Sequence, residues 1–169
     1  MNILFIYSLD AIKSITKPLV RPEQMQFGIS YISSFLKEQG HQTRLIVLSS
    51  LSGRKNIGII DEYLKRFEPK LICFTAVSTE YKFIANTAKY IKSQYPEVYL
   101  LIGGPHVSLN PEGVLSGAFD ALCIGEGENP VLELVPQLQE GNPPSGIPNL
   151  WLKQSLEIEK KWDYRGSRI

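Results

Sequence analysis

Two short apolar runs each end in glycines that could bring a ligand close to the backbone. Leu100–Ile102 leads into Gly103-Gly104-Pro105-His106, and Ala121–Ile124 leads into Gly125-Glu126-Gly127-Glu128. Each run is typical of a buried strand that ends in a turn with few side chains. Ligands of an open α/β sheet bind beyond the carboxyl ends of its strands. Two such turns on neighbouring strands therefore predict a large, flat ligand that lies against the main chain.

Hydroxyl side chains follow a third apolar run. Leu71–Phe74 leads into Thr75-Ala76-Val77, and Ser78 and Thr79 come next. Hydroxyls at a strand end can hydrogen-bond a ligand, or they can satisfy the backbone groups that the strand leaves free. The residue types leave both roles open. The candidate ligand contacts of the three turns are Thr75, Val77, Ser78, Thr79, Gly103, Gly104, Pro105, His106, Gly125, Glu126, Gly127 and Glu128.

Several of these residues also have an ordinary structural interpretation. Gly103 and Gly104 could simply form a tight turn, and His106 could lie on a surface loop. Glu126 and Glu128 precede a helical pattern, where carboxylates complement the helix dipole. That role is compatible with accepting hydrogen bonds from a ligand. We expect Asp120 to tie the turn before the last strand, and we expect no residue of this chain to be catalytic or to ligate a metal.

Five strand patterns alternate with helical patterns along the chain. The strands are expected at Ile3–Tyr7, His41–Leu48, Leu71–Phe74, Val98–Ile102 and Ala121–Ile124. Helical spacing of apolar residues predicts helices near 25–39, 57–67, 81–91, 110–116 and 129–138. We interpret the Met25–Leu36 stripe of the first helix as core. Pro136 should kink the last helix or end it early.

This alternation predicts an α/β fold. Right-handed βαβ units give a mostly parallel sheet with helices on both faces. Five units favour a flavodoxin-like (Rossmann-type) three-layer sandwich with a five-stranded parallel sheet of order 2-1-3-4-5. We expect this domain at residues 1–141, followed by a linker and short extension at 142–169 in which Leu150–Leu152 and Leu156–Ile158 could pair as a hairpin. We expect the chain to be the front part of a longer protein.

Composition narrows the function. The 169 residues carry a net charge of +1 with scattered basic residues, which argues against nucleic acid or an anionic membrane as partner. Neither a membrane span nor a secretory leader is apparent in the sequence. Cys73 and Cys123 lie inside apolar runs and are interpreted as buried thiols, because two cysteines are too few for a disulfide framework or a zinc site. We therefore expect a cytoplasmic location.

Common ligands of this architecture fit the first turn poorly. A response regulator needs an Asp at the end of strand three and a Lys at the end of strand five, where this chain has Thr75 and Gly125. A Rossmann dinucleotide site needs glycines in the first strand-to-helix turn, and no glycine precedes Phe27 after Met1. A flavin or nucleotide carrier is disfavoured by the same long loop. Of the ligands considered for this architecture, those bound mainly at strands three to five remain possible.

The sequence resembles the cobalamin-binding N-terminal domain of cobalamin-dependent radical S-adenosylmethionine enzymes. The resemblance covers nearly the whole chain, and the pairing of Gly103-Gly104-Pro105-His106 with Gly125-Glu126-Gly127-Glu128 is its most specific part. It implies that the corrin ring lies across the strand ends and that the nucleotide tail enters between sheet and helices. It also implies a partner, the downstream radical S-adenosylmethionine barrel, with its iron–sulfur cluster and S-adenosylmethionine outside this chain.

Two departures from related carriers refine this expectation. Carriers of the methionine synthase type have D-x-H-x-x-G after the first strand, whereas this chain has Asp10-Ala11-Ile12-Lys13-Ser14-Ile15. The resemblance therefore implies base-off cobalamin without a protein histidine on cobalt, and Asp10 joins the candidate contacts. The C-x-x-x-C-x-x-C motif of the radical enzymes is also absent.

The chain is thus expected to hold cobalamin for a methyltransferase-like enzyme and to have no catalysis alone. The alternative is a degenerate domain that serves as a docking module without cofactor.

Overall fold

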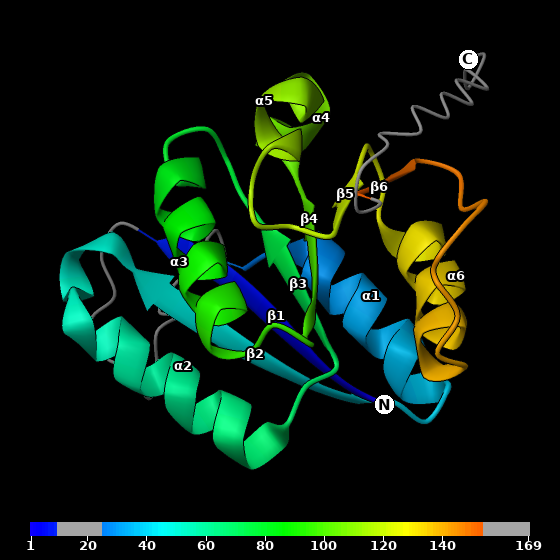
Figure 1. Ribbon diagram of the computed structural model, residues 1–169, viewed down its shortest axis with the longest axis horizontal. Helices are drawn as coiled ribbons and strands as arrows, with labels where there is room; N and C mark the ends of the chain where they lie inside the picture. Colours follow the sequence, from blue (N-terminus) through cyan, green and yellow to red (C-terminus); the bar gives the residue numbers. More distant parts are fainter. Residues whose placement is uncertain (10–24, 154–169) are drawn as a thin grey trace.

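A six-stranded sheet forms the centre of the computed structural model, which describes residues 1–9 and 25–153 (Figure 1). Its strands lie in the order β2-β1-β3-β4-β5-β6. The first five strands are parallel, and β6 runs antiparallel to β5. The strands are β1 (Asn2–Leu9), β2 (Gln42–Ser49), β3 (Leu71–Thr75), β4 (Tyr99–Gly103), β5 (Ala121–Cys123) and β6 (Leu150–Leu152).

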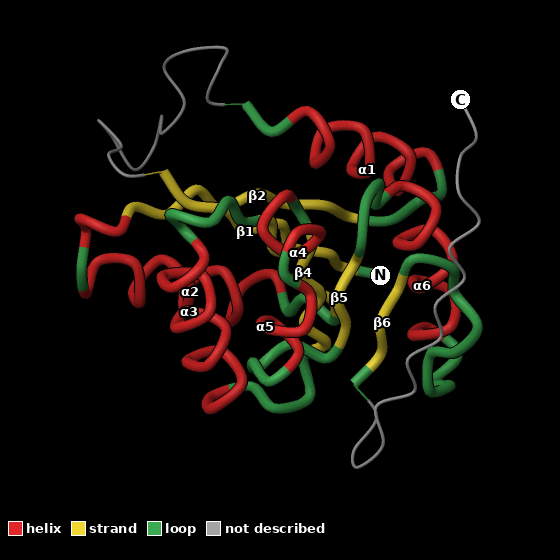
Figure 2. The backbone as a smooth tube through the Cα atoms, turned by 90° about the horizontal axis from the view of Figure 1, so that it is seen from above, coloured by secondary structure: helices red, strands yellow, loops and turns green. Residues whose placement is uncertain are grey.

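Helices cover both faces of the sheet. Figures 1 and 2 show α2 and α3 on one side and α1 and α6 on the other, while α4 and α5 lie beyond β4. The α-helices are α1 (Phe27–Glu38), α2 (Arg54–Phe67), α3 (Tyr81–Gln94), α4 (Pro105–Leu109), α5 (Pro111–Leu115) and α6 (Glu128–Gln139), and a 3₁₀ turn, η2, spans Ser50–Ser52.

Alternating side chains of the strands build two hydrophobic cores. Leu4 and Ile6 of β1 face the layer of α2 and α3, whereas Ile3 and Phe5 face the layer of α1 and α6. Successive strand residues point to opposite faces, and both faces are covered here. The strands therefore appear in the sequence as continuous apolar runs. The predicted three-layer α/β fold and the strand order 2-1-3-4-5 are confirmed.

The sheet has one strand more than predicted. Leu150–Leu152 is extended as expected, but it pairs with β5 and thereby adds a strand to the sheet. Without β6 the short strand β5 would have unpaired backbone groups along one edge. The second half of the expected hairpin, Leu156–Ile158, lies outside the described residues. A domain boundary at residue 141 stays a prediction, although Ile147, Leu150 and Trp151 are all buried on its C-terminal side.

The interpretation of the first helix as a core stripe is wrong for Met25 and Phe35. Only Leu36 is buried in α1, while Met25 and Phe35 are 44% and 45% exposed. Ile29 and Ile32 are half-buried. Ile29 and Ile32 still pack against the core on this face of the sheet, but Leu36 alone is fully buried. The space that remains belongs to the site described below.

Two further helix expectations need correction. The helix α6 does not end at Pro136 but continues to Gln139, where Glu140 N donates to Pro136 O at 3.0 Å. Proline lacks only its own backbone N–H, so the residues that follow Pro136 can still donate and close the last turn. The expected helix at 110–116 is α5, and a second short helix, α4, precedes it with Pro105 at its start.

Asp120 has the structural role that was expected of it. Its backbone N–H donates to Leu100 O at 2.8 Å, and its carboxylate accepts from Leu100 N at 2.7 Å. Lys92 Nζ lies 2.7 Å from the same carboxylate. The residue therefore ties the start of β5 to β4 and α3.

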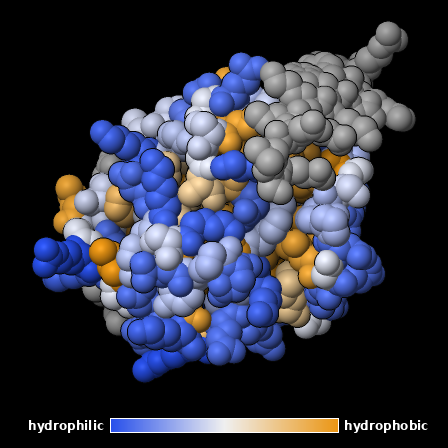
Figure 3. All heavy atoms as spheres, in the orientation of Figure 1, coloured by the Kyte–Doolittle hydropathy of each residue, from blue (hydrophilic) through white to orange (hydrophobic). Residues whose placement is uncertain are grey.

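The surface seen in Figure 3 is largely hydrophilic, with hydrophobic side chains in small separate patches. Among the described residues no helix has the length and hydropathy that a bilayer crossing requires.

Candidate functional site

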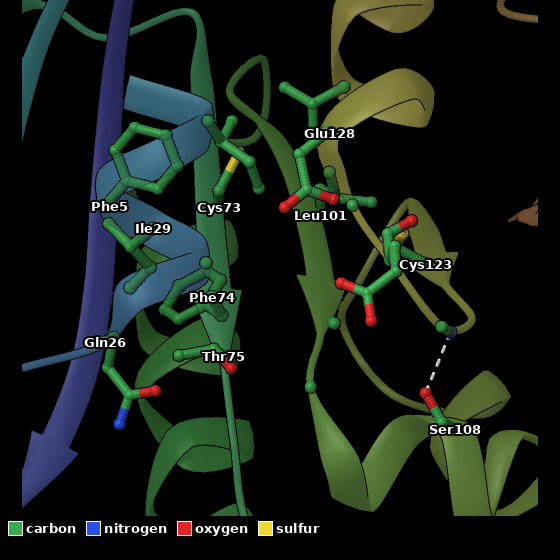
Figure 4. Close-up of a pocket in the computed structure, with 18 of the residues that line it drawn as sticks. Phe5, Gln26, Ile29, Cys73, Phe74, Thr75, Leu101, Ser108, Cys123 and Glu128 are labelled. Atoms are coloured by element: carbon green, nitrogen blue, oxygen red, sulfur yellow. Dashed lines mark hydrogen bonds between the residues drawn. The ribbon is translucent and has the colours of Figure 1, made fainter. Parts of the chain in front are cut away.

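The turns after β3, β4 and β5 are joined by hydrogen bonds at the carboxyl edge of the sheet. Ala76 N donates to Gly103 O at 3.2 Å, and His106 N donates to Ala76 O at 3.2 Å. Gly125 N donates to Ser108 Oγ at 2.9 Å, which connects the third turn to α4 (Figure 4). The glycine turns predicted from the sequence therefore lie side by side and hold one another in place.

A cavity of about 360 Å³ opens beside these turns, between the sheet and the helices α1 and α6. This volume is within the range of small-molecule sites. Its floor is the α1-facing side of the sheet, where Phe5, Cys73, Leu101 and Cys123 are buried. The described residues that line it are Phe5, Gln26, Gly28, Ile29, Ile32, Cys73, Phe74, Thr75, Leu101, Gly103, Gly104, Pro105, Ser108, Cys123, Gly125, Glu126, Gly127, Glu128 and Val131.

The cavity exists because α1 leaves the sheet uncovered near the strand ends. Leu36, near the end of α1, is fully buried on the sheet, and Ser33 Oγ lies 2.7 Å from Thr43 Oγ1 of β2. Towards its start, α1 presents Ile29 and Ile32 to the cavity. Opposite them, Gly127 lets the turn before α6 approach closely, since a Cβ there would lie 3.1 Å from Ile32 Cδ1.

Acidic residues and neutral thiols share this space. Glu126 and Glu128 line the cavity at the start of α6, and Figure 4 shows the Glu128 side chain directed into it. Burial, followed by the negative charges of Glu128 and Glu126, raises the pKa of the Cys123 thiol to about 12. Burial also raises the pKa of Cys73. Both thiols are therefore protonated and uncharged at neutral pH, and they act as small apolar groups.

Gly104 serves the fold as well as the site. Its φ of +99° lies in a region that L side chains rarely adopt. A Cβ at this position would overlap Thr75 Oγ1 and would lie 3.0 Å from both the N and the O of Ala76. The glycine is therefore required where β4 passes the end of β3, and the free space for a ligand lies elsewhere along the turn. At Gly125, by contrast, a Cβ would meet no atom within 4 Å.

The structure brings eight of the thirteen predicted contact residues to the cavity. They are Thr75, Gly103, Gly104, Pro105, Gly125, Glu126, Gly127 and Glu128. Val77, Ser78 and Thr79 are exposed in the loop after β3 and do not line it. Asp10 lies outside the described residues.

His106 is held away from the cavity by two neighbours. Its Nδ1 lies 3.0 Å from Ser78 Oγ, and its ring stacks on that of Tyr81 with 4.2 Å between centroids. Its Nε2 is buried and has no hydrogen-bond partner among the described residues. A role for His106 in ligand binding stays a prediction. No group of three or more His, Cys, Asp and Glu side chains that could hold a metal is found within 1–9 and 25–153.

Sequence reasoning missed the wall formed by α1 and α4. Gln26, Gly28, Ile29 and Ile32 line the cavity, and so does Ser108. The half-buried isoleucines look like core residues in sequence, and their spacing carries no sign of a cavity. Gly28 was the available signal, because a glycine inside a helix usually has a packing or functional reason.

An α/β sheet with an open cavity at its carboxyl edge is the usual arrangement of a ligand-binding domain, and comparison with known proteins identifies the family. The profile of the B12 binding domain family matches residues 20–135. The chain therefore belongs to the B12-binding domain family. It is also 28% identical over 163 residues to an uncharacterized methyltransferase of Pyrococcus horikoshii, covering 95% of this chain but 34% of that relative.

Two solved structures share the fold. The radical S-adenosylmethionine methyltransferase TsrM from Kitasatospora setae matches with a TM-score of 0.69 and 17% identity, over 91% of this chain and 28% of that one. The cobalamin-dependent S-adenosylmethionine radical enzyme OxsB, solved with aqua-cobalamin and S-adenosylmethionine, matches with a TM-score of 0.66 and 19% identity, over 91% and 21% of the chains. The chain thus spans about a third or less of the length of each of these three proteins.

Proposed function

We propose that this domain binds cobalamin in the base-off form, with the nucleotide tail in the cavity and the corrin ring across the carboxyl edge of the sheet. The observation that carries the proposal is the cavity itself. It lies beside the three turns that the sequence singled out, and the chain belongs to a family named for B12 binding. When bound, cobalamin would supply the organometallic chemistry, and the protein would bind and orient it.

The residues present fit such a ligand in two zones. In Figure 4 the hydrophobic Phe5, Cys73 and Leu101 lie deep in the cavity, whereas Thr75 and Ser108 lie near the strand ends. An aromatic base would fill the deep zone and replace water there. The glycine turns would let the chain that links base and corrin pass close to the backbone.

The acidic residues are suited to hydrogen-bond the amides of the corrin rim, whereas they would repel the phosphate of the tail. Glu126 and Glu128 would repel a phosphate, but their carboxylates accept hydrogen bonds from amide N–H groups such as those around the corrin rim. Gly125, where a side chain would meet no atom within 4 Å, leaves open space next to these carboxylates. We therefore assign Gly125–Glu128 to the corrin rim.

We propose base-off binding without a histidine ligand, and the positions of the two histidines support it. His106 is the one histidine that the structure describes near this edge of the sheet, and its Nδ1 faces Ser78 while its ring stacks on Tyr81. His41 precedes β2, at the opposite end of the strands. A base held in the cavity would not reach the cobalt, and neither of the two described histidines is placed to replace it.

The domain is proposed to act as the cobalamin-binding module of a radical S-adenosylmethionine enzyme of the methyltransferase type. Its structural neighbour TsrM is a radical S-adenosylmethionine methyltransferase, OxsB is a cobalamin-dependent S-adenosylmethionine radical enzyme, and the Pyrococcus relative is an uncharacterized methyltransferase. Exposed hydrophobic side chains border the carboxyl edge, where a further domain would cover the corrin: Met25, Phe27, Leu51, Val77 and Leu109. Free thiols fit a reducing compartment, which keeps the cytoplasm as the proposed location.

Equilibrium dialysis against hydroxocobalamin and cobinamide tests the proposal. Cobinamide contains the corrin but lacks the nucleotide base, so we expect it to bind at least about tenfold more weakly than cobalamin. The electron paramagnetic resonance spectrum of bound cob(II)alamin should lack the splitting that a coordinated lower nitrogen produces. Equal binding of both corrinoids, or no retention of either one, would contradict the assignment of the cavity to the tail.

Two helical glycines provide a matched pair of variants. Gly28 of α1 lines the cavity, Gly58 of α2 does not, and a Cβ added at either one meets no atom within 4 Å. We expect Gly28→Leu to fill the mouth of the cavity and lower cobalamin affinity by about tenfold or more, with folding retained. Gly58→Leu should bind like the parent chain. A Gly28→Leu protein that binds normally would refute the proposed entry route.

A further inference from the structure

We infer that the cavity selects corrinoids by the base of their lower tail and favours a methyl-substituted benzimidazole over a purine. The inference rests on the proposed function, because it concerns the same cavity. It goes further by naming the chemical class of corrinoid that the protein takes. The selectivity depends on how many hydrogen-bond donors reach the deep part of the cavity.

The deep zone is almost entirely apolar. Phe5, Leu101 and Val131 are each no more than 3% exposed in the protein, and Ile29 and Ile32 form the opposite wall. Of the two thiols of the floor, that of Cys73 lies in this zone, whereas Cys123 lies beside Gly103, level with Thr75 and nearer the mouth. A thiol is a weak donor, and that of Cys123 already lies 3.6 Å from Glu126 O.

Stronger donors lie at the mouth. Gln26 precedes α1, Thr75 is the last residue of β3, and Ser108 belongs to α4, so all three are near the carboxyl edge (Figure 4). Glu128 is directed into the cavity, but an ionised carboxylate only accepts hydrogen bonds. The deep zone therefore offers no strong side-chain donor among the described residues.

Purines and benzimidazoles differ in how many hydrogen-bond donors they require from the protein. A purine attached to ribose exposes several ring nitrogens that accept hydrogen bonds, in addition to its exocyclic group, whereas a benzimidazole has a single free ring nitrogen and an otherwise apolar outline. The ring nitrogens of the purine would be buried in the deep zone without side-chain donors. Burying a polar group without a partner is unfavourable, and burying methyl groups is favourable.

Dialysis against cobalamin and its adenine-containing analogue, in parallel at the same concentrations, tests the inference. We expect the adenine analogue to bind at least about tenfold more weakly. Equal affinity would overturn the selectivity while leaving the proposed function in place. Failure to retain cobalamin itself would overturn the proposed function, and the selectivity with it.

A pair of substitutions on the floor assigns the effect to the cavity. Cys73→Ser places a hydroxyl donor where the thiol lies, so the preference for cobalamin should fall by several-fold. Cys73→Ala removes the thiol without adding a donor and should leave the ratio of the two affinities unchanged. If the ratio of the affinities for cobalamin and the adenine analogue changes equally in Cys73→Ser and Cys73→Ala, hydrogen-bond donors do not determine the preference. Comparison of the two ratios, rather than of absolute affinities, cancels losses that come from reduced stability.

Discussion

Replacing Gly104 by alanine should lower the free energy of unfolding of the domain, whether or not a ligand is present. The residue has φ of +99° and ψ of 176°, a region that is almost restricted to glycine and costs other residues about 1–3 kcal/mol. The new Cβ would also overlap Thr75 Oγ1 and press on the backbone of Ala76. Overpacking of this kind costs about 1–3 kcal/mol more. The expected loss is about 2–6 kcal/mol, a large part of the stability of a typical domain.

Urea unfolding followed by circular dichroism measures this loss. The midpoint should fall by about 1 M or more without a change in slope. Gly58→Ala is the control, because Gly58 lies inside α2, where alanine is favoured by about 0.5–1 kcal/mol. The double variant Thr75→Ala/Gly104→Ala should recover only part of the loss, since the contacts with Ala76 remain. A Gly104→Ala protein as stable as the parent would refute the reasoning.

Two further changes test the hydrogen bonds and thiols of the fold. Asp120→Ala removes the carboxylate that contacts Leu100 N and Lys92 Nζ, and the free energy of unfolding in urea should fall by about 1.5–3 kcal/mol. A fall below about 0.5 kcal/mol would show that these two contacts contribute little to stability. Burial raises the pKa of Cys123 from 9.0 to about 12, so above pH 9 the unfolded chain releases a proton that the folded chain keeps. Stability should therefore fall between pH 9 and about 12, by up to about 1.4 kcal/mol per pH unit for this thiol. Cys123→Ala should reduce that slope, and an unchanged slope would mean that the thiol is not responsible.

The strands could be predicted because this sheet is buried on both faces. Leu71–Phe74 is a continuous apolar run that follows Pro69, and the alternation with helices then restricts the topology. The antiparallel strand β6 could not be predicted in the same way. It has three residues, and its pairing with β5 depends on where the chain returns in space.

The site could be predicted only where backbone shape is visible in the sequence. Turns with glycines after β4 and β5 were recognisable, because few residues tolerate such conformations. The contribution of α1 was not, since Ile29 and Ile32 have the spacing of core residues whether they meet a sheet or a cavity. The pattern shows which face of a helix is apolar, and the distance to its neighbour is a tertiary property.

The strand β6 has a practical consequence for anyone who shortens this chain. It covers the side of β5 that would otherwise present free N–H and C=O groups, and Lys153 N continues the protection by donating to Asp120 O at 2.8 Å. A version cut at residue 141 would uncover a row of backbone groups able to recruit a strand from another molecule. Such a protein should self-associate, so expression fragments of this domain should extend at least to residue 153.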